Sequence, residues 1–295
     1  MIVYNELLGY PKYKIVQDTE MFNFSTDSIL LASFATINVK MKKIVDFCSG
    51  NFPIPIYLTL RTDASIDGIE IQEAACNLAK ESLKINNLEG QIAIYNEDVI
   101  GIHKKFGLDY ADLVLCNPPF FKYQEDSNIN HNLELTIARH EVKIKLEDVI
   151  KEASLILRQG GYFAMVHRPE RLVEILSLME KYKLMPSRLQ FVYPKMGKEA
   201  NHLLIEGRKG GKKNPNLRIL APLYVHDENN QWTNDILKIY NYNKEEWFYV
   251  FKFIKSKGNF KVFGFSHLHG WYRWWSYWYR KEYFRKNVSR SWICS

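Results

Sequence analysis

From Lys43 onward, short apolar segments alternate with amphipathic ones, and this alternation limits the possible folds more than any other feature of the chain. Strands are predicted at 43–48, 66–71, 91–96, 111–116 and 161–167, with further strand-like runs at 187–193 and 201–207. Amphipathic helices are predicted between or after them, at 54–61, 73–86, 145–158 and 169–182. Such alternation is typical of an α/β fold with a mainly parallel, doubly wound sheet.

A polar and proline-rich segment, Asn117-Pro118-Pro119-Phe120, directly follows the apolar run 111–116. An apolar run that ends at a turn signal indicates a buried strand, so the segment is expected at a strand's carboxyl end, where open α/β sheets bind ligands. The two prolines fix φ and lack N–H groups, which leaves a rigid turn with unpaired carbonyl acceptors. With the Asn amide oxygen and the Phe ring, these acceptors suit a planar group that carries an NH2.

The tetrapeptide also predicts a reaction. An aromatic or amide NH2 is a poor nucleophile because its lone pair is delocalised. If the Asn117 side chain and the Pro118 carbonyl each accept one N–H hydrogen, the nitrogen becomes more tetrahedral and its lone pair points outward. Attack on an in-line methylsulfonium then depends on positioning and prearranged dipoles, without a strong base. Asn117, Pro118, Pro119 and Phe120 are therefore the predicted catalytic segment.

Polar residues also follow the first three predicted strands. The turn from Asp46 to Asn51 ends the first strand, and its glycine, Gly50, allows a ligand to approach the backbone closely. Glu70 ends the second strand about 20 residues later and suits ribose hydroxyls. Asp98 follows the third strand, where it can accept an adenine amino group. The Gly-x-Gly-x-x-Gly fingerprint is absent, so S-adenosylmethionine is the predicted cofactor instead of NAD.

The net charge of +7 does not describe the whole chain. The segment 244–295 alone holds 11 Lys or Arg against 3 Asp or Glu, together with 18 aromatic residues. This pattern could form a stacking surface for single-stranded RNA, but so many exposed aromatics favour an appendage outside the catalytic machinery, including a non-native coding end. Three regions are predicted: an N-terminal extension 1–42, a methyltransferase domain 43–241 and a basic, aromatic tail 242–295.

The four cysteines show no metal-type spacing, which favours a reduced, cytoplasmic protein without a metal site. The chain shows no basic and apolar leader and no apolar run of about 18 residues, so neither export nor membrane spanning is expected. A monomer is expected.

Six segments together resemble the bacterial tRNA1(Val) (adenine37-N6)-methyltransferase family, which belongs to the class I S-adenosylmethionine-dependent methyltransferases. The resemblance covers about residues 10 to 241 and lies in 24–32, 46–51, 68–72, 116–120, 138–141 and 167–171. The last two segments are the most diagnostic of this family. The resemblance implies a seven-stranded sheet with one antiparallel strand, and transfer of a methyl group to the N6 atom of a tRNA adenine.

The resemblance also implies roles for individual residues. The implied cofactor-binding residues are Asp46, Ser49, Gly50, Asn51, Glu70, Gln72, Asp98 and Asn117. The implied RNA-binding residues are Arg139, His140, His167, Arg168 and Arg171. One position departs from the family pattern: Phe52 stands where a second glycine is usual, and its side chain is expected beside the methionine end of the cofactor. An adenine in an anticodon loop must leave its stack to react, and Phe120 could then stack on it.

Other functions use the same residues. Methylation of a glutamine N5 atom in a release factor relies on the same Asn-Pro-Pro-aromatic chemistry, although it usually accompanies a helical recognition domain before the sheet. Methylation of a DNA adenine or of a guanine N2 in rRNA also fits. A different class of function is an RNA-binding protein with impaired catalysis, which Phe52 and the aromatic tail would support.

Overall fold

The computed structural model describes residues 1–7, 9–21, 26–120, 144–210 and 216–241, and the backbone of 254–256 and 259–261. The chain divides into two compact units, Met1–Tyr242 and Asn243–Ser295. In the second unit, β12 (Ile254–Ser256) and β13 (Asn259–Lys261) form a short antiparallel ribbon. Most of the aromatic tail thus lies outside the described residues. Among the helices that are described, none is long and apolar enough to cross a membrane.

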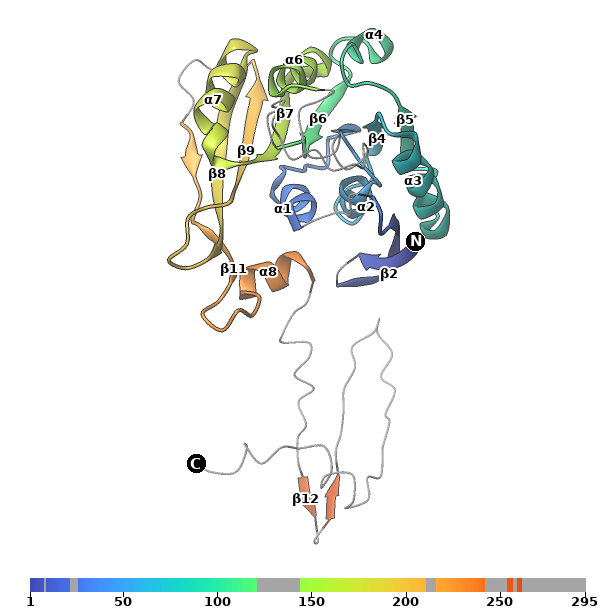
Figure 1. The fold of residues 1–295 in the computed structure, drawn as a ribbon, viewed down its shortest axis with the longest axis vertical. Coiled ribbons are helices and arrows are strands. Elements are labelled where there is room, and N and C mark those ends of the chain that lie inside the picture. Colours follow the sequence, from blue (N-terminus) through green and yellow to red (C-terminus); the bar gives the residue numbers. More distant parts are fainter. Residues whose placement is uncertain are drawn as a thin grey trace. The chain divides into compact units, whose positions relative to one another are not determined.

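The predicted strands lie in one central sheet of the first unit (Figure 1). They are β3 (Lys43–Phe47), β4 (Ser65–Glu70), β5 (Ile92–Asn96), β6 (Ala111–Cys116), β7 (Leu157–His167), β8 (Leu184–Lys195) and β9 (His202–Lys209). The short strands β10 (Arg218–Ile219) and β11 (Leu223–His226) both pair with β8. The sheet order is β10-β8-β9-β7-β6-β3-β4-β5, and β9 runs antiparallel to both of its neighbours. The seven predicted strands and the single antiparallel one are confirmed, and two short strands extend one edge.

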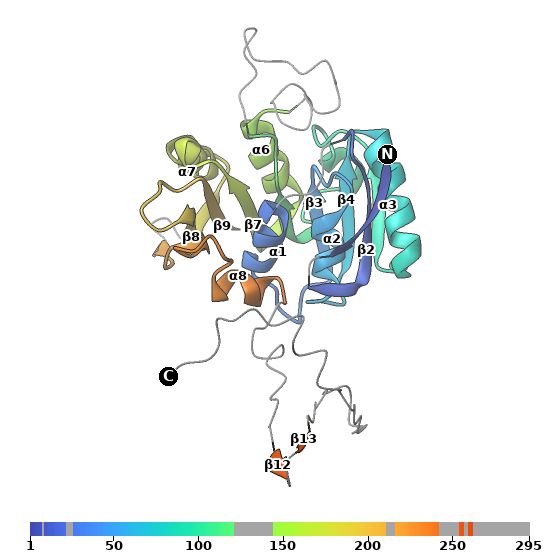
Figure 2. The same ribbon diagram turned by 60° about the horizontal axis from the view of Figure 1, so that its bottom comes forward.

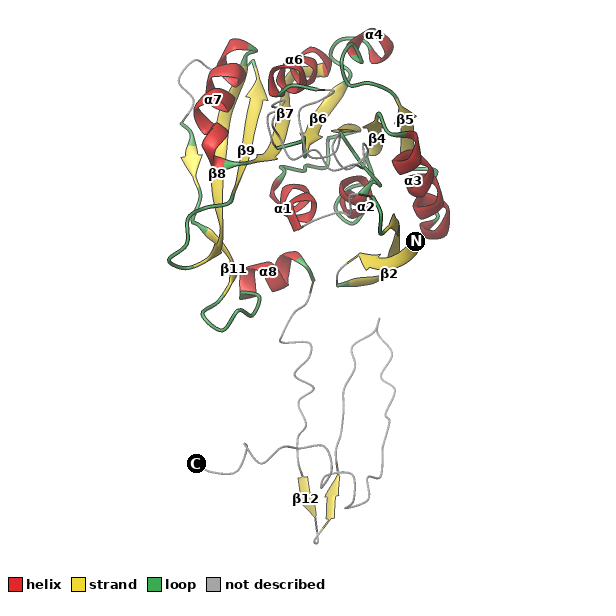
Figure 3. Cartoon of the chain, in the orientation of Figure 1, coloured by secondary structure: helices red, strands yellow, loops and turns green. Residues whose placement is uncertain are grey.

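Helices cover both faces of this sheet, as the doubly wound prediction requires (Figure 3). One core contains side chains of α1 (Thr26–Phe34), α2 (Pro53–Leu58), α3 (Glu73–Asn86) and α8 (Asn234–Ile239). The other contains side chains of α6 (Leu146–Ile156) and α7 (Leu172–Lys181), with the short α4 (His103–Phe106) and the 3-10 turn η1 (Pro169–Arg171) nearby. The pattern predicts a helix to residue 158, but α6 ends at Ile156 because Leu157 already pairs with Ala111 in the sheet.

Strand β6 shows how the sequence supplies both cores at once. All six of its residues are buried, and their side chains alternate between the two faces. Leu113 and Leu115 pack in the core with α1 and α2, while Val114 and Cys116 pack in the core with α6 and α7. A run that is apolar except at one position, here Asp112, is the pattern of a strand covered on both faces. The strand therefore holds the segment that follows it, beginning at Asn117, at a fixed place on the sheet edge.

The N-terminal region contains a hairpin that the sequence pattern does not predict. Strands β1 (Ile2–Leu7) and β2 (Tyr10–Asp18) pair antiparallel, and β2 packs on α3 (Figure 2). The backbone N–H of Val16 donates to Ser82 Oγ at 2.9 Å, and that of Lys14 donates to Asn86 Oδ1 at 2.9 Å. Side chains of α3 thus satisfy one edge of β2. The hairpin brings the end of β2 close to the turn after β3.

Helix α1 is buried among α2, α8, β7 and β9. Glu206 of β9 bonds the residue that follows the last turn of this helix. The Glu206 carboxylate accepts from the Thr36 N–H at 2.7 Å and from the Thr36 hydroxyl at 2.8 Å. Arg188 bonds the same carboxylate at 3.0 Å and donates to the carbonyl of Phe34 at 2.6 Å. Arg61 donates to the carbonyls of Ala32 and Ala35. These bonds satisfy the end of the helix and fix its position over the sheet.

Candidate active site

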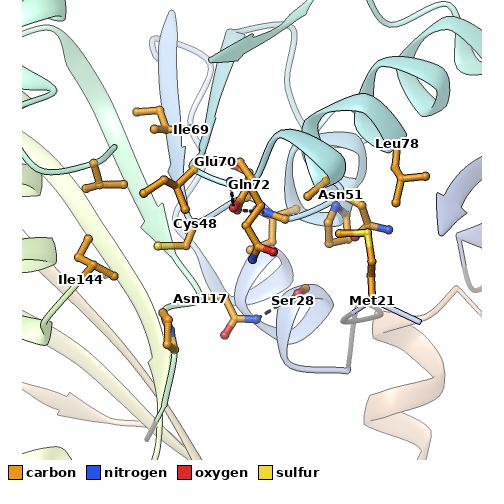
Figure 4. Close-up of a pocket in the computed structure, with 18 of the residues that line it drawn as sticks. Met21, Ser28, Cys48, Asn51, Ile69, Glu70, Gln72, Leu78, Asn117 and Ile144 are labelled. Carbon is orange, nitrogen blue, oxygen red and sulfur yellow. Dashed lines mark hydrogen bonds between the residues drawn. The ribbon is translucent and has the colours of Figure 1, made fainter. Parts of the chain in front are cut away.

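A hollow that is partly open to solvent lies at the carboxyl ends of β3, β4, β5 and β6 (Figure 4). Most of the residues that the sequence predicts for a cofactor site line it. They are Ser49, Gly50, Asn51, Glu70, Gln72, Asp98 and Asn117, and Pro119 of the catalytic segment joins them. The hollow therefore brings the turn after β3, the ends of β4 and β5 and the segment after β6 to one place, as expected at the carboxyl edge of a parallel sheet.

Glu70 joins two of these elements through its carboxylate. Oε2 accepts from the backbone N–H of Gly50 at 2.8 Å, and Oε1 accepts from that of Gln72 at 2.8 Å. Burial raises the pKa of Glu70, while these two backbone hydrogen bonds oppose the increase. Each carboxylate oxygen has a second lone pair, so the group can still accept from a vicinal diol. This arrangement suits the ribose of a nucleoside.

The turn after β3 has an unusual backbone. Cys48, Gly50 and Phe52 have φ values of 55°, 54° and 69°, which are all in the left-handed region. Gly50 adopts this conformation without strain and leaves open space where a Cβ would stand. Asn51 ties the turn to the N-terminal hairpin, since its Nδ2 donates to the carbonyl of Val16 at 3.1 Å.

Phe52 does not line the hollow, and the expectation that its side chain lies beside the cofactor is wrong. Its ring is fully buried in the core with α1 and α2. The ring lies over Gly68 of β4, where an added Cβ would stand only 2.1 Å from the Phe52 Cε1 atom. The glycine of β4 thus provides the room for the ring. Residue 52 takes the left-handed backbone that explains why glycine is usual here, but its side chain points away from the ligand site.

Asp46 also does not line the hollow. Its side chain is fully buried, and neither carboxyl oxygen makes a hydrogen bond in the described part of the chain. The Ser49 hydroxyl donates to the Asp46 backbone carbonyl at 2.8 Å and not to its carboxyl group. Burial raises the pKa of Asp46 well above its ordinary value, the nearby Ser49 hydroxyl opposes this increase, and the charge of Glu70 adds to it. The Asp46 carboxyl, at the start of the glycine turn, therefore stays protonated to a higher pH than an ordinary Asp.

Replacing Asp46 by Asn is expected to stabilise the cofactor-free protein as pH rises. A carboxyl whose pKa is raised on folding favours the folded state below its unfolded pKa, and this stability is lost as pH rises toward the folded pKa. The neutral amide has no such loss. Urea denaturation between about pH 4.5 and about pH 8 should show a gap in favour of D46N that widens by up to about 1.4 kcal/mol per pH unit. A gap independent of pH would contradict this explanation.

The predicted catalytic segment lies directly after β6. Asn117 faces the hollow, and its Nδ2 donates to the hydroxyl of Ser28 on α1 at 3.1 Å. Pro118 and Pro119 are buried, and Pro119 lines the hollow. The ring of Phe120 lies outside the lining, 5.5 Å from the His167 ring and 5.7 Å from the His202 ring between centroids. The segment is thus supported from α1, β7 and β9 together.

The predicted RNA-binding residues lie in two places. Arg139 and His140 lie outside the described residues. His167 ends β7 and is fully buried, and burial with the nearby charge of Arg171 lowers its pKa to about 4, so its ring is neutral at pH 7. Arg168 pairs with Glu170 at 3.4 Å, and Arg171 makes two hydrogen bonds to Glu174 at 2.8 and 2.9 Å. His167 is therefore an inner neutral residue, and both arginines already have acidic partners.

Sequence reasoning does not identify the lining that comes from the first 42 residues. Asp18 at the end of β2, Met21 after it and Ser28 on α1 all line the hollow. The capped helix start predicted near 24–32 marks α1, but the pattern contains no signal for its direction. Apolar lining comes from Ile54, Ile69, Ile71, Leu78, Val99 and Ile144. Within the described residues, no group of His, Cys, Asp and Glu could hold a metal ion.

Curated relatives share the sequence pattern across most of the first unit. A tRNA1(Val) (adenine(37)-N6)-methyltransferase of Parabacteroides distasonis is 26% identical over 202 residues, which is 68% of this chain and 83% of the relative. A relative of the same name from Porphyromonas gingivalis is 28% identical over 209 residues, covering 69% and 81%. Both alignments cover most of the relatives' own length.

Solved structures share the fold. A crystal structure of a predicted O-methyltransferase from Agrobacterium tumefaciens superposes with a TM-score of 0.58 at 21% identity, covering 73% of this chain and 96% of that one. At this identity the likeness concerns the fold alone. The sequence also matches the methyltransferase small domain family over residues 13–184. This match confirms the predicted enzyme class and, with it, S-adenosylmethionine as the methyl donor. The chain belongs to the methyltransferase small domain family.

Proposed function

We propose that this protein transfers a methyl group from S-adenosylmethionine to the N6 atom of an adenine in tRNA, at position 37 of the anticodon loop. The observation that carries the proposal is the position of Asn117, which faces the same hollow as Glu70 and Gly50. Acceptors for an amino group and a nucleoside site therefore share one cavity. The names of the relatives support tRNA as the substrate and position 37 as the target.

The residues of the hollow fit S-adenosylmethionine. Glu70 would bind the ribose hydroxyls with the lone pairs that its backbone bonds leave free. The side chains of Ile71 and Val99 would enclose the adenine ring, with Asp98 at its amino group. The turn at Gly50 leaves room for the remaining part of the molecule. When bound, the cofactor supplies an electrophilic methyl group.

The protein's part in the reaction is to orient the substrate amino group. Asn117 Oδ1 and the Pro118 carbonyl accept its two hydrogens, which directs the nitrogen lone pair toward the methyl donor. Because the nitrogen becomes positively charged as the bond forms, these fixed dipoles stabilise the transition state. Phe120 stacks on the base that leaves the anticodon loop. The proton that is finally lost can pass to solvent, so no basic side chain is needed.

The proposal also covers the residues that contact the tRNA and the cell compartment in which the protein acts. Arg168 and Arg171 follow β7, which is the strand that supports Phe120. They would bind the RNA backbone in place of their present acidic partners. Arg139 and His140 are proposed to contact the RNA as well. Cys48, Cys76 and Cys116 are free thiols, which agrees with a reduced, cytoplasmic setting. The protein is proposed to act there as a monomer.

An assay of the reaction product tests this function. The protein is incubated with labelled S-adenosylmethionine and unmodified tRNA, and the RNA is digested to nucleosides. Labelled N6-methyladenosine is expected, and sequencing of the product should place it at position 37. Parallel reactions with a release factor, duplex DNA and rRNA test the other amino-methyltransferase functions. Methylglutamine on the release factor with unlabelled tRNA would overturn the proposal, and tight tRNA binding without methylation of any substrate would favour an RNA-binding protein.

A further inference from the structure

The Asn117 amide is hydrogen-bonded by one residue outside the predicted catalytic domain. In Figure 4 the amide nitrogen of Asn117 lies on the side of Ser28, and the hydrogen bond from Nδ2 to Ser28 Oγ measures 3.1 Å. An amide side chain has one donor end and one acceptor end, and turning it over exchanges them. Methylation of an NH2 group needs the acceptor end toward the substrate. In this structure Nδ2 is bonded to Ser28 and Oδ1 stays out of that bond, so the contact holds the side chain with its acceptor end available.

Ser28 is well placed for this task because its own position is fixed. It is 5% exposed, and its helix α1 is held at the other end by Glu206, Arg188 and Arg61. A hydroxyl on so rigid an element cannot follow the Asn117 side chain if it turns. The bond therefore restrains the amide more strongly than a partner on a loop would.

The first turn of α1 supports the catalytic segment at both of its ends. Ser28 accepts from Asn117, while Asp27 pairs with the His202 ring at 3.3 Å between Oδ1 and Nε2. The His202 ring in turn contacts the Phe120 ring, with 5.7 Å between centroids. Ser28 thus bonds the first residue of the Asn-Pro-Pro-Phe turn directly, and Asp27 is linked to the last one only through the His202 ring. This arrangement favours a supporting role for the helix and not a chance contact of one hydroxyl.

We propose that Ser28 is a positioning residue, which anchors the Asn117 side-chain amide at the edge of the hollow. This inference rests on the proposed function for its effect on turnover. The restraint on the amide itself is a property of the protein alone and can be measured without substrate. Partners that orient a residue of a functional site are commonly worth about 10- to 100-fold in activity or affinity, and a loss of kcat in that range is expected here.

The test compares Ser28→Ala with Ser33→Ala, which makes the same change on the same helix away from the hollow. S28A should lower kcat by about 10-fold or more, with KM for the substrate and the Kd of S-adenosylmethionine within about threefold of the wild type. S33A should retain wild-type kinetics. Ser28→Thr keeps the hydroxyl and should restore most of kcat, whereas Ser28→Cys, which is nearly the same size but a poor acceptor, should behave like S28A.

A second measurement needs no turnover. The side-chain NH2 signals of Asn117 are identified in ¹⁵N NMR spectra by their loss in N117A, and their hydrogen exchange is followed in the cofactor-free protein. S28A, or S28C if the alanine variant does not fold, should exchange about tenfold faster than the wild type, and S28T should not. Unchanged exchange in S28A would overturn the inference, as would wild-type kcat in that variant. If the wild type methylates no tRNA, the proposed function fails, and the exchange rates alone decide the role of Ser28.

Discussion

Asn117→Ala is expected to lower kcat by at least about 10³-fold, while the Kd of S-adenosylmethionine stays within about threefold of the wild type. The side chain lies at the carboxyl end of β6, faces the hollow and is held by Ser28. Loss of one fixed dipole at a transition state typically costs about 10²- to 10³-fold, and here the amide also holds the substrate nitrogen in line. The carboxylate of Glu70 and its backbone partners are untouched by the change, so cofactor binding should persist.

Single-turnover kinetics and calorimetry measure the two parts of this prediction separately. Asn38→Ala is the matched control, since the Asn38 side chain lies in an exposed turn and accepts from the backbone N–H of Lys40 at 3.0 Å. Asn117→Asp tests the amide more finely, because it keeps an acceptor but cannot donate to Ser28. If N117A retained more than about a tenth of wild-type turnover, the catalytic role of Asn117 would be wrong.

The parts of the site that lie at strand ends could be predicted from the sequence. A parallel sheet aligns its carboxyl ends, so Gly50, Glu70 and Asn117 must come together once their strands are identified. The run 111–116 makes that identification secure, because a strand buried on both faces is apolar at nearly every position, and only Asp112 is polar here. Local sequence patterns therefore predict which distant residues meet, because the fold aligns the ends of the strands.

The contributions from the first 42 residues could not be predicted in this way. Ser28 reaches Asn117 across 89 positions of sequence, and Asn51 reaches the carbonyl of Val16 across 35. Those contacts depend on how α1 and the N-terminal hairpin pack on the sheet, which hydrophobic periodicity does not determine. The sequence pattern does not predict the direction in which a single side chain points either. Phe52 occupies a glycine position of the turn, yet its ring direction depends on the space above Gly68 of another strand.

Phe52→Gly is expected to destabilise the protein by about 1–4 kcal/mol without weakening cofactor binding more than about threefold. Removal of a fully buried Phe side chain costs about 3–5 kcal/mol. Glycine at φ 69° should recover about 1–2 kcal/mol, because it relieves the left-handed strain of a residue with a Cβ. Urea denaturation measures the first effect and calorimetry the second. A large gain in cofactor affinity would mean that the ring does obstruct the ligand site.

Gly68→Ala completes this experiment, because the two positions share one space. In the wild type, the added Cβ would stand 2.1 Å from the Phe52 ring, so G68A alone should cost about 1–3 kcal/mol through overpacking. In the Phe52→Gly background the ring is gone, and the same methyl group enters empty space and fills part of the cavity. The double variant should therefore be more stable than the sum of the single changes predicts, with a coupling of about 1–3 kcal/mol. Additive effects would show that the ring and the glycine do not meet. The coupling separates two explanations of the large residue in the glycine turn: a side chain accommodated by the neighbouring strand, or damage to the cofactor site.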